Sequence, residues 1–270
     1  MLGPRIPYTA TYRLVEAFRH ISTHEVEEVL STQLMELRFL GAEDNKLAFC
    51  MQQLESSQQA FPATKRPWAA VTPIFDKLLL VTDLTGALRR VLNKAELADK
   101  WAALRRSLPL QHPPAVVANL AADVDRLLRE PGALEKLLRN ASAGFLLADT
   151  SGLREPPGPL VREQQLDYFL DGYGLPLFTT SSLTEIPAEA AYTLATVGVL
   201  NAEKFNQKAF AKWLKRKVDI YDLKVEIRAD FEQRHVLNRH QQVTYAEQYV
   251  AAEVPGCYSQ TRARTLELLK

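Results

Sequence analysis

The sequence is short of the residues on which several common chemistries depend. It has two cysteines in 270 residues, Cys50 and Cys257, which are too few for a disulfide framework and do not form a C-x-x-C pair. It has only 11 glycines, and neither the G-x-x-x-x-G-K-[ST] nor the G-x-G-x-x-G phosphate motif occurs. No serine lies in a G-x-S-x-G nucleophile elbow. We therefore expect a non-enzymatic protein without a cofactor or metal ion.

An excess of charge of one sign and long apolar runs are also missing. Lysine and arginine together number 33 and the acidic residues 32, so the net charge is +1. Such a balance gives no long-range attraction to nucleic acid, and we expect no nucleic-acid partner. No segment reaches the roughly 18 consecutive apolar residues of a membrane helix, and residues 1–8 lack the pattern of a secretory signal. These features predict a soluble cytoplasmic protein without a membrane span.

Strict alternation of apolar and charged residues is the strongest positive signal. Between Leu223 and Phe231 every second residue is apolar, and the residues between them are charged. A period of two places successive side chains on opposite faces of a strand, so one face is apolar and the other hydrated. Parallel strands buried on both faces read as continuous apolar runs, so this pattern favours an antiparallel sheet covered on one side. It predicts three long final strands, at residues 223–236, 242–254 and 258–269.

The first part of the chain also predicts strands. Residues 8–19 alternate with one violation, Glu16, which falls among the apolar positions. A second extended run, residues 25–40, is followed by a polar turn and by a hairpin strand over residues 46–54. Two shorter strands are predicted at residues 78–81 and 88–92.

A helical pattern begins at Asn93. Asn93 and Glu96 match a capping box, and apolar residues recur every three to four positions up to Leu108. Two more helices are predicted, over residues 116–128 and from Pro131, a residue favoured in the first helical turn. After them we expect a weak helix at residues 162–172 and strands at 175–183 and 191–199.

The composition predicts two segments joined by a loop. Residues 1–150 contain the first strands and the three helices, and residues 161–270 contain a helix and the long strands. Prolines and glycines make residues 151–160 the best boundary, because proline removes backbone donors. The two halves can form one compact unit. The predicted fold class is α+β, with long antiparallel strands in a one-side-covered sheet that can curve, packed against several amphipathic helices.

A basic stripe is predicted on the helix that begins at Asn201 and ends near Val218. Phe205 and Trp213 lie on the opposite side and can dock the helix on the sheet. Such a stripe can hold phosphates or an acidic partner, but the solvated face of a docked helix has the same composition. The candidate partner-binding residues are Lys204, Lys208, Lys212, Lys215 and Arg216.

Two other groups of residues are candidate enzyme sites. The segments around Asp83 and Asp149 approach the aspartic-protease pattern, but each has one extra residue between aspartate and glycine. We interpret both aspartates as turn residues. His20 and His24 have the spacing of a helical metal site, yet they flank a predicted turn, and we interpret them as solvated side chains, as we do His235 and His240 near the end of the chain.

The preferred functional hypothesis is a scaffold or interaction protein in a larger bacterial-type assembly. Long one-sided strands and alternating surface charges favour protein partners that bind at sheet edges and helix faces. The alternative is a carrier of an apolar ligand in a cleft between sheet and helices. The order of elements resembles that of lipid carriers built from a half-barrel and helices, such as the bacterial lipoprotein carriers, although no motif residue carries the likeness.

Overall fold

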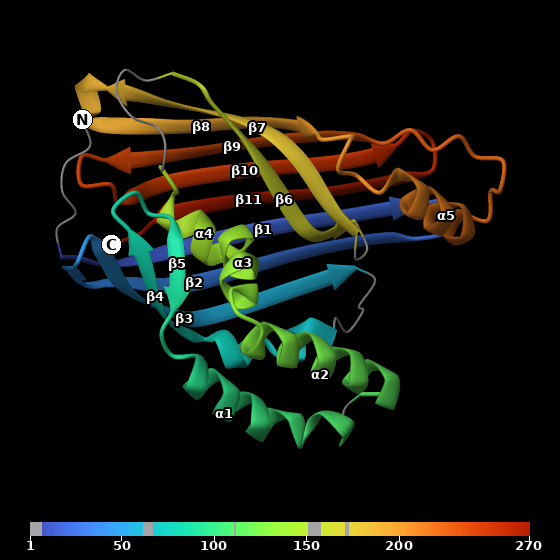
Figure 1. Cartoon of the computed structure of the whole chain (residues 1–270), viewed down its shortest axis with the longest axis horizontal. Coiled ribbons are helices and arrows are strands. Elements are labelled where there is room, and N and C mark those ends of the chain that lie inside the picture. The colour runs from blue at the N-terminus through green and yellow to red at the C-terminus, as the bar shows by residue number, and fades with distance from the viewer. Residues whose placement is uncertain (1–6, 62–66, 111, 151–157, 171–172) are drawn as a thin grey trace.

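One open antiparallel sheet runs through the whole structure (Figure 1). The computed structural model describes residues 7–61, 67–110, 112–150, 158–170 and 173–270. The sheet has 11 strands in the order β5-β4-β3-β2-β1-β11-β10-β9-β8-β7-β6. The strands are β1 Thr9–Ser22, β2 Val26–Glu43, β3 Lys46–Phe61, β4 Lys77–Asp83, β5 Leu88–Val91, β6 Leu160–Leu170, β7 Tyr173–Ile186, β8 Ala191–Leu200, β9 Arg228–Asn238, β10 Val243–Val254 and β11 Tyr258–Leu268. The α-helices are α1 Lys94–Arg105, α2 Pro114–Arg129, α3 Ala133–Asn140, α4 Ser142–Leu147 and α5 Gln207–Val218.

Two meanders meet in the middle of the sheet. Strands β1 to β5 lead outward to one edge, and strands β6 to β11 lead inward from the other. The first and last strands pair along most of their length, with Leu14 opposite Leu266. Both predicted segments therefore contribute to the same sheet. Whether they are separate domains stays a prediction, and residues 151–157 of the proposed boundary lie outside the described residues.

The alternation predicted from sequence is present on the strands. On β9, Ala229 and Phe231 are buried on the inner face, whereas Arg228 and Asp230 are exposed on the outer face. This confirms the mixed α+β class and the antiparallel sheet. The strand begins at Arg228 rather than at Leu223, because the neighbouring strand β10 ends at Val254 and offers no partner to the earlier residues.

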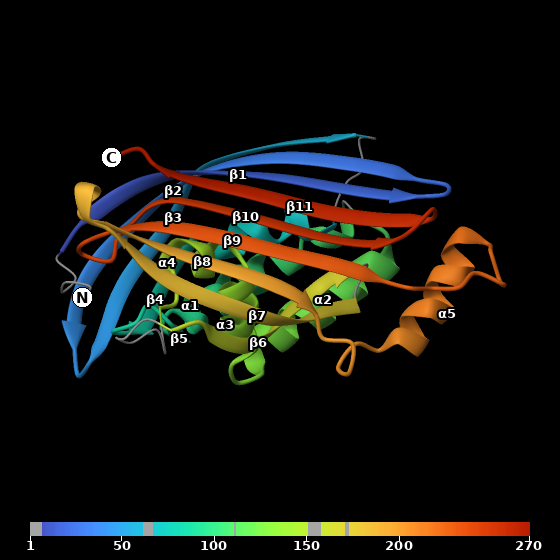
Figure 2. The ribbon, with the colours of Figure 1, turned by 90° about the horizontal axis from the view of Figure 1, so that it is seen from above.

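The helices lie on the inner side of a curved sheet, as the view from above shows (Figure 2). The first core joins inner-face residues such as Phe49 to helical residues such as Trp101 and Leu134. The second core lies at the other end of the sheet, where Phe210 of α5 joins Phe231 and neighbouring strands. The inner face is thus buried in two separate apolar regions.

Three local predictions were wrong for identifiable reasons. Asn93 makes no cap bond; its Oδ1 accepts from the Leu79 amide at 3.0 Å, which ties the start of α1 to β4. Helix α5 begins after Asn206 rather than Asn201, and Asn206 Oδ1 accepts from the Ala209 amide at 3.1 Å. A weak helix was predicted over residues 162–172, but residues 162–170 belong to strand β6, and residues 171–172 lie outside the described residues.

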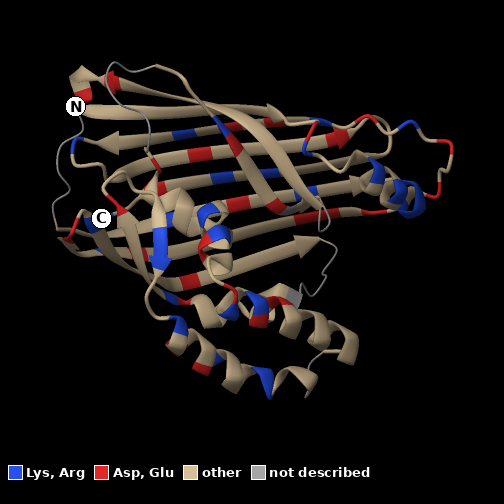
Figure 3. Cartoon of the chain, in the orientation of Figure 1, with Lys and Arg blue, Asp and Glu red and all other residues tan. Residues whose placement is uncertain are grey.

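Charged residues of both signs are spread over the strands, and lysines and arginines gather on α5 (Figure 3). In the part of the chain that the structure describes, no helix is both long and apolar enough to cross a membrane.

Candidate functional site

A row of polar side chains crosses the inner face of the sheet and separates the two cores. It includes Glu16, the residue that violates the alternation of β1. Glu16 lies opposite Arg264 on β11, and Arg264 lies opposite Gln248 on β10. The cross-strand register continues the row to both sides. Its members, from β3 to β7, are Gln58, Ser31, Glu16, Arg264, Gln248, Gln233, Thr196 and Ser181.

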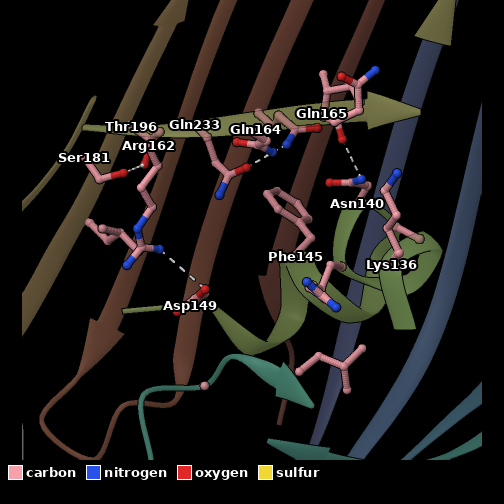
Figure 4. A pocket seen from close by; sticks show the side chains of 18 of the residues that line it. Lys136, Asn140, Phe145, Asp149, Arg162, Gln164, Gln165, Ser181, Thr196 and Gln233 are labelled. Carbon is pink, nitrogen blue, oxygen red and sulfur yellow. Dashed lines mark hydrogen bonds and ion pairs between the residues drawn. The ribbon is translucent and has the colours of Figure 1, made fainter. Parts of the chain in front are cut away.

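A cavity of about 350 Å³ lies over this polar row, between the sheet, strand β6 and the helices α3 and α4. Apolar walls come from Phe145, Leu166 and Leu194. Figure 4 shows Asn140 and Phe145 on the helical side and Gln164 and Gln233 on the strands. The polar lining residues, several of them members of the row, are Lys136, Arg139, Asn140, Asp149, Arg162, Glu163, Gln164, Gln165, Ser181, Thr196, Gln233, Gln248 and Arg264.

A chain of hydrogen bonds connects the cavity floor to α4. Gln248 Nε2 donates to Gln233 Oε1 at 2.6 Å, and Gln233 Nε2 lies 3.4 Å from His235 Nδ1. His235 Nε2 lies 2.9 Å from the carbonyl oxygen of Phe145. A carbonyl can only accept, so the neutral imidazole carries its proton on Nε2 and accepts at Nδ1. The network therefore fixes one histidine tautomer and holds helix and sheet together.

Burial sets the protonation state of His235. The side chain is 1% exposed and lies edge-on to the Phe145 ring. Removal from water lowers the pKa of His235 to about 4, although its hydrogen bond to the Phe145 carbonyl acts in the opposite direction. Desolvation disfavours the charged imidazolium. At neutral pH the residue is therefore a neutral hydrogen-bonding link.

Two arginines on β11 lie beside one carboxylate. The Nε of Arg264 is paired with Glu16, and its Nη1 donates to the Asn140 carbonyl at 3.0 Å. Arg262, two residues earlier on the same face, has its guanidinium 5.4 Å from the centre of the Phe169 ring. Its Nη2 lies 3.5 Å from Gln248 Oε1. Burial, followed by the charge of Arg264, lowers the pKa of Arg262 to about 9, which Glu16 partly opposes.

Polar contacts at the rim hold α3 and β6 over the floor. Asn140, at the end of α3, donates from Nδ2 to the Gln165 carbonyl on β6 at 2.8 Å. Arg162 of β6 lies 3.5 Å from Asp149, which follows α4. On the floor itself, the hydroxyls of Ser181 and Thr196 are hydrogen-bonded at 2.8 Å. The cavity is therefore framed by contacts between several elements.

A second hollow, of about 600 Å³, lies elsewhere on the sheet. It is lined by residues of β1, β2, β3 and β11, including Leu30 and Phe61. These two side chains are 46% and 73% exposed, so they offer a surface rather than an enclosed space. The cleft predicted between sheet and helices corresponds instead to the inner cavity, whose lining is more polar than an apolar ligand requires.

The predicted basic stripe lies on and before α5, and one of its members contacts a residue that lines the cavity. Lys204 precedes the helix and pairs with Glu163. Lys208, Lys212 and Arg216 are exposed, and Lys215 is half-buried. Its role in binding a partner stays a prediction.

Of the two candidate catalytic aspartates, Asp83 ends strand β4 and binds the turn that follows it, whereas Asp149 lies just after α4, with residues 151 and 152 of its motif outside the described residues. Asp83 Oδ1 accepts from the Thr85 amide at 2.9 Å, and its other oxygen is bonded by Arg89 at 2.6 Å. Desolvation opposes the effect, but the bonds to Thr85 and Arg89 hold the pKa of Asp83 below its usual value. The two motifs do lie side by side, because Thr150 donates its amide proton to the Thr85 carbonyl at 2.8 Å.

The predictions for two histidines were wrong. His20 and His235 were expected to be solvated, yet they are 3% and 1% exposed. The His20 ring packs 5.2 Å from Tyr258, and His24 lies 3.3 Å from the Val218 carbonyl in α5. In the described part of the chain, no group of three or more histidine, cysteine, aspartate or glutamate residues could hold a metal ion.

The cysteines show no sign of activation. Cys257 is buried, and burial raises the pKa of its thiol. A nucleophilic thiol requires the opposite shift. Cys50 is half-buried on β3.

The sequence contains one usable signal for the site, which is the set of polar residues at inward positions. Glu16 is an example, because it is a charged residue at an inward position where its neighbours are apolar. Gln233, His235 and Gln248 occupy the same kind of position in their strands, but without the register of the sheet nothing indicates that they share one row.

Comparisons with known proteins do not identify the chain. No family model and no curated protein matches it. Among solved structures, it is similar to lipovitellin, described in terms of lipid–protein interactions, with 9% identity and a TM-score of 0.49 over 100% of this chain and 26% of that one. A DUF1329 family protein from Desulfovibrio piger gives 6% identity and a TM-score of 0.21, covering 97% of this chain and 86% of that one. The chain thus spans about a quarter of the lipovitellin chain, and both likenesses are distant.

Proposed function

We propose that the protein is a non-catalytic binder or carrier of a small ligand, held in the inner cavity between the sheet and helices α3 and α4. The observation that supports this proposal is the cavity itself, about 350 Å³ in volume. This is within the range of small-molecule sites, which are concave, partly apolar and furnished with a few convergent polar groups.

The polar row supports the same proposal. Buried polar groups cost stability unless they are hydrogen-bonded, and a row through a core is therefore an expensive way to build a sheet. Gln248 is 7% exposed and Thr196 is 8% exposed. Polar groups that face a cavity can bind a ligand, which accounts for their presence in the core better than packing alone does. Because the lining combines polar and apolar residues, an amphiphilic ligand fits it better than the purely apolar one predicted from sequence.

Filling the cavity should weaken ligand binding strongly. Ser181 lines the cavity, and the next residue, Ser182, is exposed. We expect Ser181→Trp to occupy the empty volume and to weaken binding of the probe anilinonaphthalene sulfonate at least about tenfold, whereas Ser182→Trp should not. Fluorescence titration measures both. Equal binding by the two variants would place the ligand elsewhere.

A second proposal retains protein–protein contacts as a function. Four large apolar side chains lie on the outer face of strands β6, β7 and β8, with Phe178 directly opposite Val199. Exposed apolar patches of this kind are typical of interaction surfaces. The residues, with their exposed fractions, are Val161 65%, Phe178 39%, Val197 57% and Val199 61%.

This second proposal predicts self-association through the outer face. We expect size-exclusion chromatography with light scattering to give a mass above that of one chain, and Val197→Lys to restore the mass of one chain. Leu40→Lys, on strand β2 far from these strands and 52% exposed, is the matched control and should leave the association intact. A wild-type protein that is strictly monomeric and recovers no partner from lysate would count against this function.

A further inference from the structure

The charges beneath the cavity do not balance. Arg264, 8% exposed, is paired with Glu16. Arg262 lies on the same face of β11, and its Nε is buried without a hydrogen-bond partner among the described residues. Within that part of the chain no carboxylate forms an ion pair with Arg262. The buried Arg264 and the half-buried Arg262, whose Nε is out of contact with water, therefore share one carboxylate.

The other charged groups around the cavity do not supply the missing negative charge. Asp149 is paired with Arg162, and Glu163 with Lys204. Lys136, at the rim, is paired with Asp167 at 3.1 Å. Each of these acidic groups is thus already matched to a basic group.

An unbalanced buried cation is costly, and a bound anion would remove the cost. A charge taken out of water requires a partner or hydrogen bonds. Arginine stays protonated at neutral pH, so it cannot avoid this cost by becoming neutral. Arg262 reaches the cavity floor through Gln248, which lies 3.5 Å from its Nη2 and lines the cavity. The floor is therefore electropositive at the point where Arg264 and Gln248 face the empty volume.

We infer that the ligand is a small organic acid, with one carboxylate or phosphate group on a short apolar body. The acidic group would lie on the floor against Arg264 and Gln248, next to Arg262, and the apolar body would pack against Phe145, Leu166 and Leu194. This inference rests on the proposed ligand-binding function and specifies the chemical class of the ligand.

Matched probes test the charge and the apolar body separately. Decanoate and decyl phosphate carry both features, decanol lacks the charge, and inorganic phosphate lacks the apolar body. We expect calorimetric titration to show the two amphiphilic anions binding at least about tenfold more tightly than decanol or inorganic phosphate, as charge-assisted hydrogen bonds require. Comparing the affinity for decanoate with that for decyl phosphate then shows whether the site prefers a carboxylate or a phosphate group.

Variants at Arg262 test whether this residue is responsible for the preference for anionic ligands. Arg262→Met should reduce the affinity for the anions by about tenfold, to the level of decanol, and Arg262→Lys should keep most of the preference. Arg234→Met, on the outer face where Arg234 lies 3.9 Å from Glu247, is the matched control and should change nothing. The wild-type preference alone decides the ligand class if Arg262→Met does not fold.

The outcomes separate this inference from the function on which it rests. Binding of decanol as tight as that of decanoate would overturn the inference and keep the ligand-binding function. Binding of inorganic phosphate as tight as that of decyl phosphate would overturn the amphiphilic ligand. An anion preference unchanged in a folded Arg262→Met protein would overturn the role of Arg262. Failure of all four probes to bind would contradict both proposals.

Discussion

Replacement of Glu16 by glutamine should destabilise the protein by about 3 kcal/mol, because it leaves buried arginines without their carboxylate. The side chain of Arg264 is 9% exposed and that of Glu16 30% exposed. Breaking a buried pair by removing one partner typically costs about 3 to 5 kcal/mol, and the partial exposure of Glu16 favours the lower end. Urea denaturation at pH 7 measures the loss as a shift in midpoint at constant slope.

The same pair of strands provides the control. Arg13 and Glu267, on β1 and β11, form an ion pair at 2.5 Å with side chains 51% and 42% exposed. Exposed pairs contribute little, so Glu267→Gln should cost less than about 1 kcal/mol. Adding Arg262→Met to Glu16→Gln should recover part of the loss, because one unpaired charge disappears. If Glu16→Gln and Glu267→Gln lower the free energy of unfolding equally, the buried pair contributes no more to stability than the exposed one.

Acidification from pH 8 to pH 5 should remove about 2 kcal/mol of stability through His235 alone. The pKa of this histidine is lowered by burial to about 4, against an ordinary value of 6.5. Above pH 6.5 it is neutral in both the folded and the unfolded chain, and its link between Gln233 and Phe145 is intact. As the pH falls from 6.5 toward 4, the unfolded chain takes up the proton first, so the equilibrium shifts toward unfolding.

A difference between variants isolates the contribution of His235. His235→Gln should be less stable than the wild type at pH 8, but it should not lose the further stability that protonation of His235 removes between pH 8 and pH 5. His240→Gln, in the turn after β9, should retain the wild-type slope, because it leaves His235 and its burial unchanged. Denaturation midpoints at several pH values give the slopes. If the His235→Gln protein loses stability between pH 8 and pH 5 as steeply as the wild type, the assignment is wrong.

Alternation predicted most of the sheet, and its failures occurred where the strands are irregular. Along β11, and along β10 from Ala246 onward, the inward and outward residues follow a period of two. On β6 the register shifts between Leu166 and Leu170, so two adjacent apolar residues follow a gap and imitate helical spacing. A shift of this kind depends on the partner strand and is invisible in the sequence of β6 itself.

The candidate site was less predictable than the sheet. The violation at Glu16 was visible, but its partner Arg264 is 248 residues away in the chain. Helix α4, which carries Phe145, is only six residues long and was not predicted. The basic stripe on α5 is a local pattern and was easy to find, whereas the cavity depends on residues that only the antiparallel register brings into one row.

The pairing of β1 with β11 makes completion of the sheet depend on two strands that lie far apart in the chain. During synthesis, residues 9–22 are made long before their second neighbour, residues 258–268. Until then one side of β1 presents unsatisfied amide and carbonyl groups, which attract strands of other molecules. Closing so long a loop is slow, and the nascent protein passes through an aggregation-prone interval in which chaperones can act.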